Sequence, residues 1–373
     1  MQIGIPAEIR AGEPRVAATA ETVKKLAGAG HHKVLVQSGA GAGCSIPDGD
    51  YVAAGATIVP TAAEAYQSDI VLKVRGPEPQ ELSLLKSGSV LIGLLAPHRK
   101  EGIEAIATTG VTAFAMEMLP RISRAQSMDV LSSQANVAGY KAVLVAANTY
   151  GRMMPMLMTA AGTIKAARVV VMGVGVAGLQ AIATAKRLGA VVEATDVRPE
   201  TKEQVESLGA KFIEVPLTDA EKELAKGQGG YARDMGEDYR KRQAVLVAER
   251  IKQADIVITT ALIPGRPAPV LVTEDMVKSM KPGSVILDMA VEAGGNCPLS
   301  ELDKTVVKHG VHIIGIANLP ALVAADSSAL YARNLLTFLG LMLDPKSGQF
   351  NLNREDEIIA GTLACIGGEV TRK

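Results

Sequence analysis

Short apolar, β-branched runs alternate with amphipathic stretches along the first third of the chain. Ala20–Ala27 has the spacing of an amphipathic helix with Thr19 as its N-cap, and Thr61 to Glu64 is a capping-box pattern. Alternation of strand and helix is typical of a parallel sheet covered by helices. The predicted strands are Gln2–Pro6, Val34–Gln37, Ile70–Val74, Val90–Leu95 and Thr112–Glu117.

A second series of strands begins near residue 169, and its six strands fit a complete dinucleotide-binding domain. It echoes the first series, because residues 68–73 and 85–92 resemble residues 254–259 and 280–287. The repeat indicates two Rossmann-like domains with a cleft between them. The predicted strands are Val169–Met172, Ala190–Thr195, Lys211–Val215, Asp255–Ala261, Ser284–Ala290 and His312–Ala317.

The predicted fold class is α/β, with two Rossmann-like domains whose parallel sheets are joined by long helices across a cleft. Gln126–Asn148 is expected to be one linking helix, and Ser327–Leu343 a second that returns the chain to the first domain. The first domain is then discontinuous, with residues 1–126 plus 325–373. The second domain comprises residues 127–324.

The segment Leu217–Arg242 interrupts the second domain with a polar, glycine-rich sequence between two strands. Long insertions of this kind are often lids over binding sites, so residues 220–242 are expected to form a mobile loop. A disordered surface insertion without a function is the alternative. The basic cluster Arg240-Lys241-Arg242 is expected to be a solvated helix face.

Residues 167–198 read as strand, glycine turn, helix and strand around the pattern G-x-G-x-x-G. Gly173 permits a tight turn, Gly175 lets a pyrophosphate approach the backbone, and Gly178 lets the following helix, Leu179–Leu188, lie close to the strand. The amino end of that helix would face the phosphates. This context predicts a dinucleotide site, with a purely structural glycine turn as the alternative.

Asp196 ends the strand that follows, at about the 20-residue spacing found in dinucleotide-binding domains. A carboxylate there can accept hydrogen bonds from the hydroxyls of an adenosine ribose, and it repels a 2′-phosphate. NAD is therefore predicted in preference to NADP, although the nearby Arg198 leaves NADP open.

Composition narrows the function classes. The 373-residue chain has a formal net charge of zero, so it lacks the basic character of a nucleic-acid-binding protein. Its three cysteines have no paired spacing, which argues against disulfides or a zinc site and suits a reducing cytoplasm. His309 and His312 are expected to be packing or surface residues, and no metal is expected. The longest apolar run, Val169–Leu179, is too short to span a bilayer, which needs roughly 20 residues.

The densest polar stretch runs from Pro120 to Gln134, after an apolar strand and at the start of the first linking helix. This position would place it at the cleft. Its Arg, Gln, Asp and Ser side chains could satisfy a carboxamide and ribose hydroxyls together. Helix capping by Ser127 or Asp129 is an alternative that can coexist with binding.

The segment Pro120–Tyr140, PRISRAQSMDVLSSQANVAGY, closely resembles the signature loop of the NAD(H)-binding component, domain I, of proton-translocating nicotinamide nucleotide transhydrogenases. Further segments agree with the resemblance, namely GVGVAGLQAIATAKRLGA, TKEQVESLGAKF, GGYARDMGE, TTALIPGRPAPVL and DMAVEAGGNCPLS.

The resemblance implies a soluble alpha subunit that binds NAD(H) and passes hydride directly to NADP⁺ on the NADP(H)-binding domain of a beta subunit. Proton flow through membrane-spanning partner subunits would drive the reaction. The chain would be cytoplasmic and attached peripherally to the inner membrane through those partners. A homodimer is implied, with Tyr140–Tyr150 and Arg152–Leu157 as its interface.

The resemblance also implies roles for individual residues. Arg121 and Ser132 would hold the nicotinamide carboxamide, and Asp129 would order the loop. Gln126 would reach the nicotinamide ribose of NADP(H) on the partner. The other implied contacts with the cofactor are Ile122, Ser123, Ser127, Met128, Gly173, Val174, Gly175, Val176, Gly178, Asp196, Val197, Arg198, Gly230, Tyr231, Gln243 and Leu262.

Alanine dehydrogenases have a related fold and are the main alternative. Arg15 and Lys73 stand where that resemblance implies pyruvate-binding side chains, so these two residues do not discriminate. Leu94 stands where a catalytic histidine is expected, and Glu292 replaces an expected aspartate. Without the imidazole there is no evident general acid or base for a keto acid, which favours transhydrogenase. A non-enzymatic NAD-binding module remains compatible with the fold alone.

Overall fold

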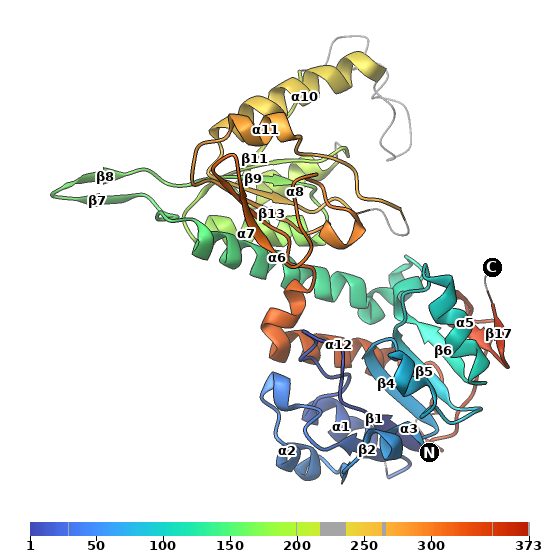
Figure 1. Ribbon diagram of the computed structural model, residues 1–373. Coiled ribbons are helices and arrows are strands. Elements are labelled where there is room, and N and C mark those ends of the chain that lie inside the picture. The colour runs from blue at the N-terminus through green and yellow to red at the C-terminus, as the bar shows by residue number, and fades with distance from the viewer. Residues whose placement is uncertain (29, 199, 217–235, 263–265, 345, 372–373) are drawn as a thin grey trace. The chain divides into compact units, whose positions relative to one another are not determined.

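The computed structural model describes residues 1–28, 30–198, 200–216, 236–262, 266–344 and 346–371. They form two compact units (Figure 1). Unit 1 comprises Met1–Gln134 and Pro320–Lys373, and unit 2 comprises Ala135–Leu319. The first change of unit falls inside the long helix α6, Val130–Thr149.

Unit 1 is built on an eight-stranded sheet in the order β17-β16-β6-β5-β4-β1-β2-β3. Strands β1 to β6 are parallel, and β16 is antiparallel to both β6 and β17. Its strands are β1 Gln2–Ile5, β2 Lys33–Gln37, β3 Thr57–Val59, β4 Ile70–Arg75, β5 Val90–Leu94, β6 Thr112–Ala115, β16 Leu363–Ile366 and β17 Glu369–Val370.

The helices of unit 1 bury their apolar faces against this sheet. α12 supplies Tyr331, Leu335 and Phe338 to the main core, and Phe338 meets Phe114 of β6 edge-to-face. These helices are α1 Ala20–Ala27, α2 Asp48–Ala53, α3 Ala62–Tyr66, α4 Pro79–Leu82, α5 Lys100–Thr108, α12 Ala324–Leu339 and α13 Glu357–Thr362, with 3₁₀ turns η1 Ala42–Cys44, η2 Met116–Met118, η3 Ser123–Met128 and η5 Leu319–Val323.

Unit 2 has a seven-stranded sheet in the order β11-β10-β9-β12-β13-β15-β14. The first six form the doubly wound parallel order, and the chain reverses direction across the sheet between β9 and β12. The carboxyl ends of these two strands mark the expected ligand crevice. The strands are β9 Arg168–Met172, β10 Val191–Thr195, β11 Lys211–Phe212, β12 Ile256–Thr259, β13 Val285–Asp288, β14 Thr305–Lys308 and β15 Val311–Ile314.

Unit 2 also contains a hairpin outside the sheet, formed by β7 Leu157–Thr159 and β8 Gly162–Ile164. Figure 1 shows it extending away from the rest of the unit. Besides its share of α6, the helices of unit 2 are α7 Val176–Arg187, α8 Thr201–Ser207, α10 Gly236–Gln253 and α11 Glu274–Ser279, with the 3₁₀ turn η4 Val291–Ala293.

The predicted fold class is confirmed, but several element boundaries differ. The first linking helix begins at Val130 rather than Gln126, because the preceding residues form the 3₁₀ turn η3. The helix after the glycine turn begins at Val176 rather than Leu179, since Gly175 already occupies the N-cap. The hairpin β7–β8, the short parallel strand β3 and the antiparallel strands β14, β16 and β17 were not predicted. The expected loop centre with Gly230 and Tyr231 lies outside the described residues.

Among the described residues, no helix combines the length and the apolarity needed to cross a membrane.

Candidate nucleotide-binding site

The glycine turn of unit 2 connects β9 to α7 at the ligand crevice. Gly173 has a φ of +98°, which an L side chain rarely adopts. A Cβ on Gly178 would lie 1.9 Å from the carbonyl oxygen of Gly173. These two glycines therefore allow the turn itself and the close approach of the helix to the strand.

Gly175 differs from both neighbours, because no described atom lies within 4 Å of the position where its Cβ would stand. Gly175 is also exposed, and no side chain of the described residues caps the helix that starts after it. The first N–H groups of α7 thus open onto a free surface beside a glycine, an arrangement that fits a pyrophosphate. Val174 is buried, whereas Val176 is 40% exposed at the same opening.

Asp196 lies next to this turn, after β10. Its Oδ2 accepts a hydrogen bond from the Val174 N–H at 2.6 Å, and its Oδ1 accepts one from the Arg198 N–H at 2.9 Å. The Arg198 guanidinium also donates to both carboxylate oxygens, at 2.9 and 3.1 Å. Partial burial raises the pKa of Asp196, but the bonds from Arg198 and Val174 outweigh it and lower the pKa. Asp196 is therefore an anion that links the glycine turn to the end of β10.

The remaining candidates in unit 2 lie in different surroundings. Val197 is 74% exposed, directly after Asp196, and Leu262 is 57% exposed, just beyond β12. Because β12 is the neighbour of β9, Leu262 follows the strand on the other side of the crevice. Gln243 is half-buried on α10, which brings no described contact to the glycine turn.

The polar loop of residues 121–132 belongs to unit 1. Its side chains divide into two sets: Ala125, Met128 and Val130 are buried in the core, whereas Arg121 and Gln126 are exposed. Ser123 and Ser127 are also exposed, and Ile122 is half-buried. Three buried apolar side chains thus hold the backbone of the loop and leave its polar groups facing outward.

Asp129 and Ser132 are joined to each other in this structure. The Ser132 N–H donates to Asp129 Oδ1 at 2.9 Å, and the Ser132 hydroxyl donates to Oδ2 at 2.5 Å. Asp129 therefore acts as the N-cap of α6. The capping alternative considered from the sequence is correct for Asp129, and it gives a physical reason why this residue would order the loop.

Two further contacts anchor the loop within unit 1, and neither was predicted. Asn334 of α12 donates to the Ser127 carbonyl at 2.8 Å and accepts from the Ser133 hydroxyl at 2.7 Å. Arg124 forms a two-bond fork with Asp356, at 2.7 and 2.8 Å. Both partners lie more than 200 positions away along the chain, so no local pattern could have indicated them.

Removing the fork should loosen the loop locally. Arg124→Ala is expected to speed hydrogen exchange of the amides of residues 123–128 by up to about five-fold, since an ion pair this exposed contributes at most ~1 kcal/mol. Hydrogen exchange read by mass spectrometry measures the change. Arg333→Ala, which removes an exposed pair with Glu21 elsewhere in unit 1, is the control and should leave these amides unchanged. Equal exchange in all three proteins would show that the fork does not hold the loop.

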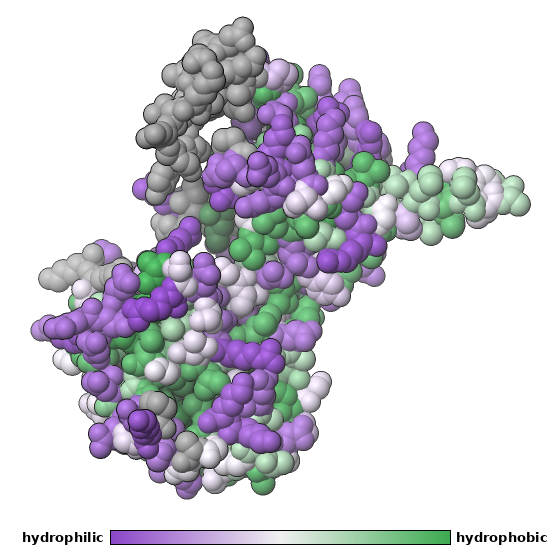
Figure 2. Space-filling model, turned by 180° about the vertical axis from the view of Figure 1, so that it is seen from behind, coloured by the Kyte–Doolittle hydropathy of each residue, from purple (hydrophilic) through white to green (hydrophobic). Residues whose placement is uncertain are grey.

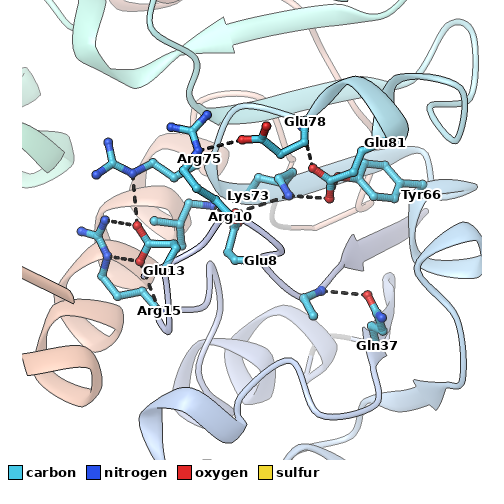
Figure 3. A network of polar contacts seen from close by, with 12 residues as sticks. Glu8, Arg10, Glu13, Arg15, Gln37, Tyr66, Lys73, Arg75, Glu78 and Glu81 are labelled. Atoms are coloured by element: carbon cyan, nitrogen blue, oxygen red, sulfur yellow. Dashed lines mark hydrogen bonds and ion pairs between the residues drawn. The ribbon is translucent and has the colours of Figure 1, made fainter. Parts of the chain in front are cut away.

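A buried ionic network lies where β1 and β4 end in unit 1 (Figure 3). Glu13 accepts two hydrogen bonds from the Arg15 guanidinium, at 2.6 and 2.5 Å, and one from Arg75 at 3.1 Å. The third Arg15 nitrogen donates to Gln134 Oε1 at 2.6 Å. Arg15 is only 2% exposed, so its charge is balanced inside the unit.

Lys73 is the centre of the second half of this network. Its Nζ lies 2.9 Å from Glu81 Oε1 and 3.3 Å from Glu8 Oε2, and Tyr66 donates a further bond to Glu81. Burial raises the pKa of Glu8, although Lys73 opposes the shift. Like Arg15, Lys73 is therefore buried and paired with carboxylates of its own unit.

Both halves of the chain match families of known proteins. Residues 4–138 match the N-terminal domain of alanine dehydrogenase/PNT, and residues 142–373 match the C-terminal domain of the same family. Together these matches span nearly the whole sequence. The chain belongs to the alanine dehydrogenase/PNT family. The resemblance noted from the Pro120–Tyr140 segment is thereby confirmed.

Similar proteins lie on both branches of the alanine dehydrogenase/PNT family. The first of the separate chains of NAD(P) transhydrogenase subunit alpha in Rhodospirillum rubrum is 56% identical, covering 99% of this chain and 97% of that protein. A crystal structure of transhydrogenase from Sinorhizobium meliloti has a TM-score of 0.90 at 53% identity and full coverage of both chains. Alanine dehydrogenase 2 of Staphylococcus aureus is 33% identical, covering 100% of this chain and 95% of that one.

Proposed function

We propose that this chain is the NAD(H)-binding subunit of a proton-translocating NAD(P) transhydrogenase and passes hydride from NADH to NADP⁺ on a partner subunit. The observation that carries the proposal is the exposed polar face of residues 121–132 on a buried apolar base. A dehydrogenase that reduces a small substrate itself has no need to present such groups to a second nucleotide. The 56% identity to a transhydrogenase alpha subunit along nearly the whole chain supports the same choice.

Residues of unit 2 would hold the cofactor. The open N–H groups at Gly175 and Val176 would bind the pyrophosphate, and the Asp196 carboxylate would bind the adenosine ribose. Arg121 and Ser132 would hold the nicotinamide carboxamide. When bound, NAD(H) supplies the hydride chemistry, which needs alignment of two carbons rather than a nucleophile or metal.

The loop would do its work by orientation. Hydride transfer from NADH to NADP⁺ gives NAD⁺ and NADPH without a proton passing through a side chain of this chain. A neutral amide such as Gln126 is therefore sufficient to bridge toward the partner's nucleotide. Coupling to proton movement, attachment to the membrane and the NADP(H) site would all belong to partner subunits.

The proposal is tested against alanine dehydrogenase by two assays on the purified chain. It should bind NADH, show no alanine-dependent reduction of NAD⁺, and gain hydride-transfer activity only when the NADP(H)-binding partner is added. Robust oxidation of alanine by the chain alone would overturn the proposal.

Asp196→Ala should weaken binding of NADH and relax the preference for NADH over NADPH. The loss of ribose bonds to a charged acceptor is expected to cost about 1.5–3 kcal/mol, or roughly 10–100-fold in affinity. Isothermal titration with both nucleotides measures the two effects. Because Arg198 would lose its partner and become available to a 2′-phosphate, NADPH should bind more tightly than to the wild-type chain. Unchanged affinity for both nucleotides would refute the ribose assignment.

We also propose that the chain forms a homodimer through the hairpin β7–β8 and the neighbouring residues 140–157. Both strands of the hairpin are exposed, with Met156 and Met158 61% and 72% accessible, and Figure 2 shows apolar residues along it. An isolated two-stranded hairpin is marginally stable in water, so a second copy of the chain is the expected cover.

The hairpin proposal predicts a change of oligomeric state. Met158→Asp is expected to convert a dimer into a monomer, since it places a charge in the proposed apolar interface. Light scattering coupled to size-exclusion chromatography reads the mass directly. Val52→Asp, at an exposed apolar position in unit 1, should remain dimeric. A Met158→Asp protein that stays dimeric would place the interface elsewhere.

A further inference from the structure

We propose that Asn296 and Thr260 are positioning residues that fix the wall of the nucleotide crevice on the β12 side. The inference rests on the proposed function, because it assigns these residues to the NAD(H) site. They lie at the carboxyl ends of neighbouring strands in unit 2 and connect the segment after β12 to two other turns. Neither residue carries a charge, and neither is among the residues expected to contact the cofactor.

Asn296 is fully buried and uses its whole amide on backbone groups. Its Oδ1 accepts from the Ala261 N–H at 3.1 Å, and its Nδ2 donates to the Ala261 carbonyl at 2.9 Å and to the Pro269 carbonyl at 2.8 Å. Its own carbonyl accepts from the N–H groups of Leu271 and Val272. One side chain thus fixes both ends of the segment that carries Leu262.

Thr260 connects the same segment to the glycine turn. Its hydroxyl donates to the Gly173 carbonyl at 3.0 Å, and its backbone N–H donates to the Met172 carbonyl at 2.9 Å. A Cβ on Gly173 would lie 2.5 Å from the Thr260 oxygen, so the contact also depends on that glycine. The two sides of the crevice are therefore joined directly by one hydroxyl.

The turn that carries Asn296 is itself held by a buried carboxylate. Asp288, at the end of β13, accepts from the Cys297 N–H at 3.0 Å and from the Ser300 hydroxyl at 2.7 Å through Oδ2. Its Oδ1 accepts from the Ala290 N–H at 3.0 Å. The polar chain therefore continues from the end of β13 through Asn296 and Thr260 to the end of β9.

This chain of bonds has a consequence for binding. The Leu262 side chain is 57% exposed immediately after the doubly bonded Ala261, so it is presented to the crevice from a fixed backbone. A side chain ordered before the cofactor arrives loses less conformational entropy on binding. Removing either anchor should weaken cofactor binding more than its effect on overall stability would suggest.

The test compares NADH affinity and thermal unfolding of the full-length chain. Thr260→Val removes the hydroxyl at constant shape and should raise the NADH dissociation constant about ten-fold, whereas Thr260→Ser keeps the hydroxyl and should stay within about two-fold of wild type. Asn296→Ala should resemble Thr260→Val. In steady-state assays with the partner, KM for NADH should rise while kcat is largely kept, as expected when binding alone is weakened.

Asp255→Ala is the matched control, because Asp255 accepts bonds from the Arg168 N–H and from Lys281 at the opposite edge of the same sheet. It should lower the unfolding temperature without changing NADH affinity. Equal NADH affinity in Thr260→Val, Thr260→Ser and wild type would overturn the positioning role. Absence of NADH binding in the wild-type chain would instead overturn the proposed function, so the two failures are distinguishable.

Discussion

Replacing Gly175 by alanine is expected to remove most NADH affinity while the protein stays folded. The φ and ψ of Gly175 are −79° and −168°, which alanine adopts readily, and no described atom lies within 4 Å of its Cβ position. The methyl group would stand where the pyrophosphate is expected. We expect affinity to fall by about 100-fold, in line with the 1–3 kcal/mol cost of overpacking. Titration with NADH and thermal unfolding are the measurements.

Two companion variants separate this steric effect from a loss of structure. Gly178→Ala should lower both stability and affinity, because its Cβ would meet the Gly173 carbonyl oxygen at 1.9 Å and must displace the turn. Gly102→Ala, in α5 of unit 1 with open space around it, should bind NADH normally and unfold no earlier than wild type. Normal NADH affinity in Gly175→Ala would contradict the assignment of the glycine turn to the pyrophosphate.

Gln126→Asn is expected to give the second large effect, on transfer rather than on binding. Gln126 is exposed on η3, whose buried residues Ala125 and Met128 fix the backbone. Shortening the side chain by one methylene withdraws the amide from the partner's nucleotide but leaves the loop fold intact. A misplacement of about 1 Å can lower a rate by about 100-fold. Rapid mixing of NADH-loaded chain with the NADP(H)-binding partner measures the rate.

The matching control is Gln349→Asn, an exposed glutamine elsewhere in unit 1, which should transfer hydride normally. NADH affinity of Gln126→Asn should stay within about two-fold of wild type, since the amide is assigned to the other nucleotide. If affinity and rate fell equally, Gln126 would be a ligand of NADH alone.

The glycine turn and its strands could be predicted from the sequence because their causes are local. Gly173, Gly178 and the β-branched run before them act within a few residues, through sterics and burial. The same holds for Thr19 and Thr61, which precede helices α1 and α3 as expected. The alternation of strands and helices was sufficient for the fold class.

Features that depend on distant partners could not be predicted. The fork between Arg124 and Asp356 joins residues 232 positions apart, and Asn296 bonds to Ala261 across 35 positions. The sequence does offer one signal for Asn296: it follows Gly294 and Gly295, both with positive φ, after a buried strand. A polar residue at such a turn is suited to bond to backbone, but its partner is set only by the folded sheet.

The linking helix shows how local signals can compete. The residues from Gln126 onward have adequate helix propensity, which favours an unbroken helix from that position. In the structure Asp129 takes the N-cap of α6, and its bonds to Ser132 end the 3₁₀ turn before it. This break keeps Gln126 off the regular helix and on the exposed surface of unit 1.

Following the hydride itself is the most direct test of transfer from this chain to a partner. NADH deuterated at the transferring position of the nicotinamide is mixed with this chain, the NADP(H)-binding partner and NADP⁺, and the NADPH formed is analysed by mass spectrometry. We expect the deuterium to appear in NADPH without loss to water, and only when both proteins are present. NADPH without the label, or equal labelling with the partner alone, would contradict direct transfer from this chain.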